Sequence, residues 1–219
     1  MAVIKLHRKR GHIIYKLANG TRVPGASTIA KVDEDYHHLL NWANDLGRQG
    51  LDHNKVREEA SDAGSVCHFL IQCYLKQDTP DLSEFSPAVI ALATVGYNKF
   101  AEWWEGEKLK LVACEVPLVS EEYRFGGTID LVAVDPQEQY FLTDQKTSKN
   151  IYLSHLIQLS AYEHLWNVNN PAQKIKRACI VRIDRNETRD FEVRPVFFTE
   201  PYFNVFKAQL ALYYAKKKI

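Results

Sequence analysis

Two aspartates and a lysine occupy positions where strand-like segments carry polar side chains among apolar ones. Asp130 interrupts the apolar stretch 126–132, and Asp144 and Lys146 end the next strand-like stretch. Because side chains alternate along a strand, Asp144 and Lys146 share one face, and Gln145 points the other way. If the two stretches form a hairpin, Asp130 and Asp144 converge at one end of a sheet.

Such convergence is costly unless a cation is present. Two carboxylates about 4 Å apart repel each other by on the order of 4 kcal/mol at an effective dielectric of about 20. Mg²⁺ or Mn²⁺ reverses the sign of this interaction, and carboxylate oxygens suit both ions. Such an ion activates a bound water and stabilises charge on a phosphodiester. Lys146 can orient or deprotonate the attacking water, or neutralise the developing negative charge.

A structural alternative stays open for each member of this set. A tripeptide of the form DxK also occurs at ordinary exposed strand ends. An acid within an apolar strand, such as Asp130, is expensive unless it is paired, and a buried salt-bridge network would pair it as well as a metal. The residue types therefore indicate either a metal site or an ion-pair network.

The overall composition is that of an ordinary globular protein and favours no partner. The chain has 219 residues, with 28 Lys and Arg against 27 Asp and Glu, so bulk charge gives no argument for nucleic acid. The start does not resemble a signal peptide, and no apolar run reaches the roughly 18 residues of a membrane span, so we expect a cytoplasmic protein. No CxxC pair occurs, and the scattered cysteines predict reduced thiols.

The N-terminal part predicts a β-hairpin followed by helices. Strand-like residues 3–7 and 13–17, with the Asn19-Gly20 turn signal, predict a hairpin or short meander. Residues 77–87 are typical of a loop. Apolar spacing predicts helices around 39–46, from about 56 to 75, and from Pro87 to about 107.

The remainder predicts a mixed sheet covered by helices. The expected elements are strands at 111–118, 127–134 and 139–144, a helix at 154–166, strands at 176–183 and 191–197 around a turn at 184–189, and a helix from Glu200. A meander followed by a crossover helix implies a mixed sheet in an α/β fold. We expect one domain over 1–219, with an N-terminal hairpin and helical part (1–85), a core (86–185) and a C-terminal strand and helix (186–219).

Asp130 followed by Asp144-Gln145-Lys146 resembles the motif of the PD-(D/E)XK nuclease superfamily. The match is best with its RecB-like branch, which includes phage exonucleases and CRISPR-associated RecB-like nucleases. The proline that often precedes the first motif acid is replaced by Ile129. Three further features, the segments 64–68 and 158–162 and the acid Glu115, extend the resemblance over roughly residues 22–185.

These features resemble known parts of that branch. The segment ending in His68 is similar to the upstream helix motif whose histidine ligates the metal, and Glu115 to an additional acid of the branch. Gln158 and Tyr162 resemble its QxxxY helix motif. The resemblance implies a restriction-endonuclease-like αβββαβ core that binds one or two Mg²⁺ or Mn²⁺ ions. The cysteine set of some CRISPR-associated members is absent, so no iron–sulfur cluster is expected.

The resemblance also implies a role for each residue. His68, Asp130, Asp144 and the Gln145 backbone carbonyl would hold a metal, and Glu115 would hold a second metal or a water. Lys146 would act on the nucleophile.

For several residues a plainer role stays open. His68 lies among apolar helix residues, and Glu115 could be the polar face of a strand. Gln158 and Tyr162 share a helix face and could contact DNA, support the catalytic strand or simply pack. Arg124 could touch phosphate or be a solvated turn residue.

The expected function is hydrolysis of DNA by an exonuclease in recombination, repair or phage DNA processing. It would act in the cytoplasm of a bacterial or phage-infected cell, with a recombination protein as a further partner. The alternatives are a nuclease fold that binds DNA without cutting it and an assembly factor held by salt bridges. Oligomeric state, polarity and strand preference are left open.

Overall fold

The computed structural model of the chain describes residues 2–8, 13–35, 37–183 and 191–218, and the turn predicted at 184–189 lies outside them. A five-stranded mixed sheet forms its centre, with strand order β5-β6-β7-β8-β9. The strands are β5 (Lys110–Ser120), β6 (Phe125–Val134), β7 (Tyr140–Lys146), β8 (Ile175–Arg182) and β9 (Glu192–Val196). Neighbours are antiparallel except β7 and β8, which are parallel and joined through helix α5 (Leu153–Asn169).

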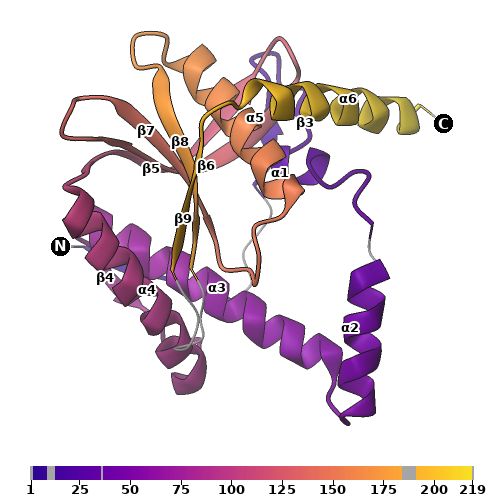
Figure 1. Ribbon diagram of the computed structural model, residues 1–219, viewed down its shortest axis with the longest axis vertical. Coiled ribbons are helices and arrows are strands. Elements are labelled where there is room, and N and C mark those ends of the chain that lie inside the picture. Colours follow the sequence, from indigo (N-terminus) through magenta and orange to yellow (C-terminus); the bar gives the residue numbers. More distant parts are fainter. Residues whose placement is uncertain (1, 9–12, 36, 184–190, 219) are drawn as a thin grey trace.

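Helices cover both faces of this sheet (Figure 1). On one face, α3 (His53–Lys76) and α4 (Pro87–Glu107) share an apolar core with residues such as Leu131 and Phe141. On the other face, α1 (Ala26–Ile29), α5 and α6 (Glu200–Lys216) pack around residues such as Ile129 and Leu142. The predicted mixed α/β fold, with the order helix, three strands, helix, strand, is therefore confirmed.

Local capping residues explain where the two long helices of the first face begin and end. The Asp52 carboxylate accepts the backbone N–H of Asn54 before α3, and Ser86 accepts that of Val89 before α4, whose first residue is proline. Both helices stop at a residue in the left-handed conformation, Gln77 and Lys108. These limits agree with the predicted helices to within a few residues.

The N-terminal prediction is confirmed in one part and wrong in another. Strands β2 (Tyr15–Lys16) and β3 (Arg22–Val23) form a hairpin across Asn19-Gly20, where Gly20 has a φ of 83°. The residues of β1 (Val3–Lys5), however, do not join this hairpin.

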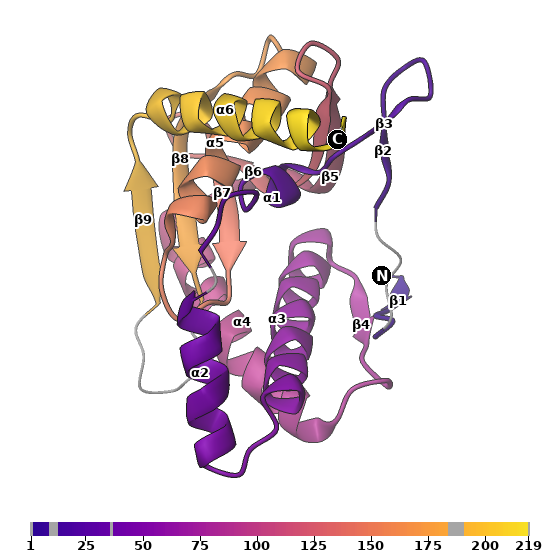
Figure 2. The same ribbon diagram turned by 90° about the vertical axis from the view of Figure 1, so that its right-hand side faces the viewer.

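Instead, β1 pairs in parallel with β4 (Thr79–Asp81), inside the segment predicted to be a loop (Figure 2). Leu6 anchors this pairing: its side chain is buried, and its N–H donates to the Asp81 carbonyl at 3.0 Å. Local sequence signals miss it because partners more than 70 residues apart form the pair.

Helix α2 (His37–Arg48) forms where apolar spacing predicted a helix, but much of its apolar side remains exposed. Leu39, Leu40 and Trp42 all lie on the surface of the described protein. The helix projects beyond the sheet beside the N-terminal half of α3 (Figures 1 and 2). No described helix is long and apolar enough to cross a membrane.

Candidate active site

His68, Glu115 and Asp130 meet in space from three different elements. His68 comes from the middle of α3, Glu115 from β5 and Asp130 from β6. One ligand atom of each lies within 4.8 Å of the others, and all three side chains are partly buried. A histidine nitrogen and two carboxylate oxygens at this spacing could hold a divalent metal ion.

An irregularity in the β5–β6 pairing brings the two acids to this position. Regular pairs flank it, Cys114 with Leu131 and Val116 with Ile129, but Glu115 and Asp130 are skipped. Glu115 has a φ of 56°, in the left-handed region. A non-glycine residue held there costs about 1–3 kcal/mol and persists only where its surroundings compensate. Strain of this kind often accompanies a functional site.

The same irregularity reverses the faces of β6. Ile129 packs with the α5 side of the sheet and Leu131 with the α3–α4 side, although residues two apart on a regular strand share a face. Asp130 lies at the reversal, between the two helical layers. It is therefore within reach of His68 on one side and of Asp144 on the other.

A glycine sets the distance between α3 and the end of β7. A Cβ placed on Gly64 would lie 2.6 Å from the Thr147 hydroxyl oxygen, so a larger residue fits only if Thr147 or the helix shifts. His68 follows Gly64 by four residues and lies on the same side of the helix. Gly64 thereby lets the helix that carries His68 come close to the strand end that carries Asp144 and Lys146.

Asp144 and Lys146 lie on one face of β7, as their spacing predicts. The Asp144 side chain is fully buried, and Lys146 Nζ lies 2.9 Å from its Oδ1 and 2.7 Å from its Oδ2. On the other face of the strand the side chain of Gln145 is also buried, and its backbone N–H donates to Asp130 Oδ2 at 2.8 Å. The two aspartates are thus linked through the backbone of β7.

Helix α5 holds the lysine from the opposite side. Lys146 Nζ donates to Gln158 Oε1 at 3.3 Å, and Gln158 Nε2 donates to the Tyr162 hydroxyl at 2.6 Å. Gln158 Nε2 also lies 3.5 Å from Asp144 Oδ1. Both Gln158 and Tyr162 are buried. Of the roles that the sequence leaves open for this pair, the geometry favours support of the strand over direct contact with DNA.

The positive charge near Asp130 and Asp144 does not fully offset the cost of burying their ionised carboxylates. Burial raises the pKa of Asp130, and the Lys146 charge opposes this rise only in part. Burial likewise raises the pKa of Asp144 to about 7, with Lys146 lowering it and Asp130 raising it. Protonation or a bound cation would relieve this imbalance, and the carboxylates and imidazole form a donor set that fits a divalent cation.

The structure does not place every predicted site residue in the cluster. Asp144 is not among the three grouped ligands and faces Lys146 instead. Arg124 lies in the β5–β6 turn with an exposed side chain, and its carbonyl accepts the Tyr214 hydroxyl. It is six residues from Asp130, about 20 Å along the strand at about 3.3 Å per residue. The proposed Gln145 carbonyl ligand stays a prediction.

Tyr15 is a supporting residue that sequence reasoning missed. Its hydroxyl is 3.0 Å from the Thr128 hydroxyl, two residues before Asp130, and its ring covers Gly126 so closely that a Cβ there would lie 2.4 Å from a ring atom. Gly127 similarly allows contact with the Tyr162 ring. The Gly126-Gly127 pair was the available signal, because adjacent glycines in a strand mark close approach of other groups.

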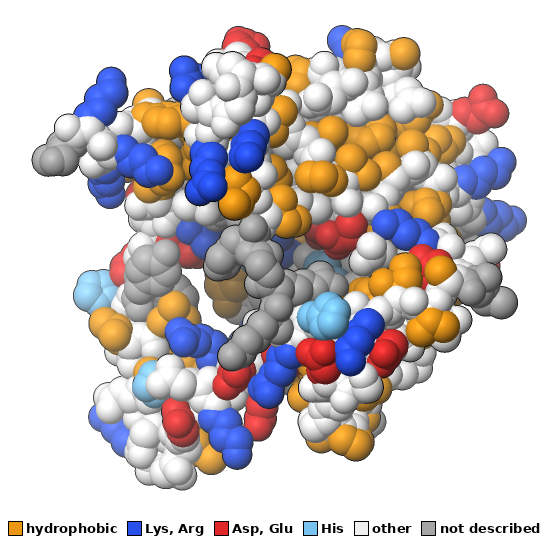
Figure 3. All heavy atoms as spheres, turned by 180° about the vertical axis from the view of Figure 1, so that it is seen from behind, with side chains coloured by type: hydrophobic (Ala, Val, Ile, Leu, Met, Phe, Trp, Pro, Cys, Tyr) orange, Lys and Arg blue, Asp and Glu red, His pale blue; other side chains and the backbone are white. Residues whose placement is uncertain are grey.

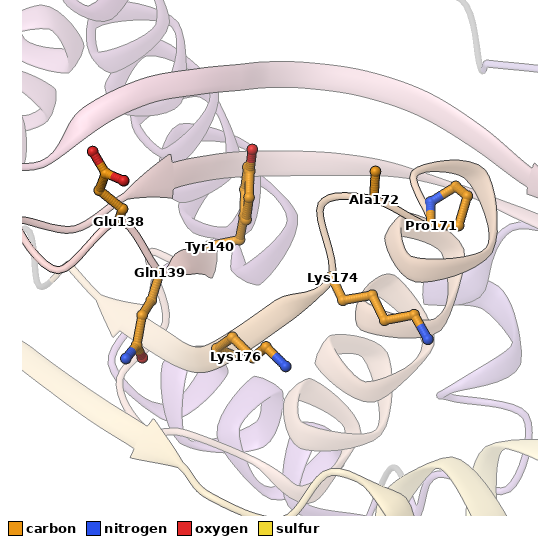
Figure 4. Close-up of a pocket in the computed structure, with 7 residues that line it drawn as sticks. All are labelled: Glu138, Gln139, Tyr140, Pro171, Ala172, Lys174 and Lys176. Carbon is orange, nitrogen blue, oxygen red and sulfur yellow. The ribbon is translucent and has the colours of Figure 1, made fainter.

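The part of the molecule that the structure describes is hollowed in more than one place (Figures 3 and 4). Its back is hollowed between the helical layers, and charged and histidine side chains gather around this hollow (Figure 3). A separate open cavity of about 380 Å³ lies at the other end of β7 and β8 (Figure 4). It is lined by Glu138, Gln139, Tyr140, Pro171, Ala172, Lys174 and Lys176.

Comparison with known proteins gives distant similarity in structure. A protein from Eubacterium rectale named "Putative exonuclease" has a TM-score of 0.47 and 13% identity over 72% of this chain and 65% of its own, so the match spans less than two thirds of that protein. The protein SSO0001 has a TM-score of 0.37 and 13% identity over 70% of this chain and 74% of its own. The sequence matches no protein-family model and no curated protein.

Proposed function

We propose that this protein is a metal-dependent deoxyribonuclease of the RecB-like branch of the PD-(D/E)XK superfamily. One observation carries the proposal: His68, Glu115 and Asp130 converge within 4.8 Å beside a lysine that a buried aspartate holds. The sequence motifs already named these three residues as candidates, although they lie up to 62 positions apart in the chain. A surface strand end or an isolated core histidine would not require their convergence.

His68, Glu115 and Asp130 would hold Mg²⁺ or Mn²⁺, with Asp144, which interacts with Asp130, as a further carboxylate beside them. A bound metal of this kind supplies an activated water and stabilises charge on a phosphate oxygen. Lys146 is placed to orient the attacking water or to neutralise negative charge that develops on the phosphate. Asp144 and Gln158 fix the position of its ammonium group.

Burial of the site favours this chemistry. Electrostatic interactions are stronger where water is excluded, so the single Lys146 charge acts more strongly than it would on the surface. Tyr162, whose pKa burial raises well above its usual value, stays protonated and acts as a hydrogen-bond partner of Gln158. We propose further that the enzyme degrades DNA from ends, in recombination, repair or phage DNA processing, as its resemblance to phage exonucleases implies.

Digestion of linear and covalently closed circular DNA in Mn²⁺ tests this function. We expect degradation of the linear DNA only, and loss of activity on chelation of the metal. Lys146→Ala should lower the rate by roughly 100- to 1,000-fold, as removal of one stabilising group does in other enzymes. Lys176→Ala, at the other end of the sheet, is the matched control and should retain the parent rate.

Each alternative has its own result. Cleavage that is unchanged in Lys146→Ala contradicts the role given to the lysine. Tight DNA binding without cleavage by the parent protein favours a binding module. Neither binding nor cleavage favours an assembly factor held by ion pairs. Cleavage of closed circles at the same rate as linear DNA contradicts the exonuclease mode.

A further inference from the structure

Tyr152 carries a partly exposed aromatic ring at the start of α5, the helix whose Gln158 contacts Lys146, and we call this end of the helix the rim of the candidate site. It is the residue immediately before α5 and follows Lys146 by six residues. Its side chain is 39% exposed, while His155, one turn into the helix, is buried. An exposed ring that rests on a buried group presents a fixed apolar surface to whatever enters the site.

His155 fixes the orientation of this ring. The two rings meet edge to face, with centroids 5.3 Å apart and an interplanar angle of 79°. The backbone N–H of Tyr152 also donates to His155 Nδ1 at 3.3 Å. Two contacts from one buried residue therefore hold both the backbone and the ring of Tyr152.

The same histidine lies between Tyr152 and the residues that contact Lys146. His155 and Gln158 are three residues apart and lie on the same side of α5, and Gln158 accepts from Lys146. Burial, together with the charges of Lys146 and Lys31, lowers the pKa of His155 to about 3, so both cations lie within electrostatic reach of the ring. The exposed Lys31 adds positive charge near this rim.

We propose that the Tyr152 ring is a stacking platform for an unpaired base of the DNA substrate. This inference rests on the proposed nuclease function and deepens it, because it names the form of DNA that the site takes. Aromatic side chains next to cationic groups bind single strands by stacking on bases and by attraction to phosphates. Bases within a duplex already stack on each other, so the platform requires a single-stranded or melted end.

Fluorescence of 2-aminopurine tests the platform in the full-length chain. The probes are two 12-nucleotide single strands that carry 2-aminopurine as the terminal base, one at the 5′ end and one at the 3′ end. Binding is measured with Mn²⁺ in the Lys146→Ala background, so that the strands are not cut. We expect the fluorescence of at least one probe to fall on binding, and the responding end gives the polarity.

Variants at Tyr152 then separate stacking from simple burial. Tyr152→Phe keeps a ring and should retain the quenching. Tyr152→Leu keeps apolar volume without a ring and should lose it, as should Tyr152→Ala, with binding weakened by roughly 5- to 100-fold. Phe198→Ala removes another exposed aromatic ring, which is 79% exposed two residues before α6, and should have no effect. Thermal unfolding of each variant checks that it folds.

The outcomes distinguish this inference from the function on which it rests. Failure of the parent background to bind either probe overturns the platform and, if linear DNA is also not cut, the nuclease proposal. Binding with quenching unchanged in Tyr152→Leu and Tyr152→Ala overturns the platform alone. Equal loss in Tyr152→Phe also overturns it, because stacking does not need the hydroxyl.

Discussion

The two ends of the β6–β7 hairpin each bury an aspartate, and the two aspartates differ in how fully their carboxylates are hydrogen-bonded. At the turn end, Asp135 is 4% exposed and accepts the backbone N–H groups of Gln137 and Gln139, each at 2.9 Å, and the Arg177 guanidinium at 3.0 Å. At the open end, Asp144 is 0% exposed and contacts Lys146 at 2.9 Å, the Gln158 amide at 3.5 Å and a second buried acid, Asp130.

The pKa shifts follow from this difference in partners. Burial would raise the pKa of Asp135, but the hydrogen bonds from Gln139, Arg177 and Gln137 together lower it below its usual value. At Asp144 burial prevails over Lys146, and the nearby Asp130 raises the pKa further, to about 7. A carboxylate that serves only structure has its hydrogen bonds satisfied. A buried carboxylate that lacks such partners reduces stability and indicates a functional site.

Substitution of each aspartate by asparagine should give the largest difference in activity between the two ends of the hairpin. Asp144→Asn removes the charge that holds Lys146 and that adds to the metal-binding acids, so we expect cleavage of linear DNA to fall by about 1,000-fold or more. Asp135→Asn is the matched control. It should keep near-normal activity but lose about 1–3 kcal/mol of unfolding free energy, because charge-assisted hydrogen bonds are lost. Similar activity losses in both variants would contradict the distinction.

The two aspartates should also give opposite dependences of stability on pH in the metal-free protein. The pKa of Asp144 is raised to about 7 in the folded state from its usual value of 3.8, so its contribution to stability is complete below pH 4 and is lost as pH rises through about 7. Between pH 5 and 8 this loss is on the order of 3 kcal/mol. The lowered pKa of Asp135 has the opposite sign: its contribution is present at neutral pH and is lost as pH falls.

Urea unfolding in EDTA at several pH values measures both contributions. Asp144→Asn should reduce the loss of stability between pH 5 and 8, and Asp135→Asn should reduce the loss below pH 4. Added Mn²⁺ should diminish the loss at high pH, because metal binding favours the ionised carboxylates. A parent protein whose stability is the same at pH 5 and 8 would contradict the raised pKa of Asp144.

The sequence predicts the parts of the site that depend on local periodicity. The spacing of Asp144 and Lys146 places them on one face of a strand, and the spacing of Gln158 and Tyr162 places them on one face of a helix. Both arrangements are observed, and the second pair contacts the first. Alternation in strands and helical spacing hold wherever an element is regular, so no tertiary information is needed to predict them.

Other features depend on contacts that no local pattern records. The face reversal at Asp130 arises from the left-handed backbone of Glu115 and the pairing around it. The contacts of Gln158 with Asp144 and Lys146 depend on α5 packing against the sheet. The β1–β4 pair joins segments that are far apart in the chain. The sequence therefore indicates which residues come close together more reliably than how they are arranged.

Substitution of Gly64 should loosen the open end without removing any polar group. In Gly64→Ala the new Cβ would lie 2.6 Å from the Thr147 hydroxyl oxygen, so the Thr147 side chain or α3 must shift, and a shift of α3 moves His68 with the helix. We expect about 10- to 100-fold weaker Mn²⁺ binding in a calorimetric titration, as is usual when a supporting contact of a metal site is disturbed. Gly106→Ala, which has no atom within 4 Å of its new Cβ, is the control.

Removal of the opposing hydroxyl gives a second test of this contact. The double variant Gly64→Ala, Thr147→Ala should recover most of the lost affinity, because the closest remaining atom, the Thr147 Cβ, is 3.6 Å from the new methyl group. Recovery would show that distance between α3 and β7 sets metal affinity. Equal weakness in the single and double variants would mean that Gly64 acts through the helix backbone instead.

The smallest effect should come from the lysines of the cavity at the turn end. Lys174 and Lys176 line this exposed hollow, where β7 and β8 begin, whereas Lys146 is the last residue of β7. Residues 140 and 146 are about 20 Å apart along the strand, more than twice the Debye length of about 8 Å in physiological salt. Their charges should therefore be screened from the reacting end, and Lys174→Ala, Lys176→Ala should change the cleavage rate by less than about 2-fold.

The salt dependence of DNA affinity tests directly whether Lys174 and Lys176 contact the DNA. Each lysine that neutralises a DNA phosphate contributes about 0.9 to the slope of log affinity against log salt concentration. If the DNA contacts only the Asp144 end of the hairpin, the Lys174→Ala, Lys176→Ala variant keeps the slope of the parent protein. A slope reduced by nearly 2 would place both lysines on the path of the DNA. The two ends of the hairpin would then form one continuous binding surface, with Asp135 near one end of the bound DNA and Asp144 near the other.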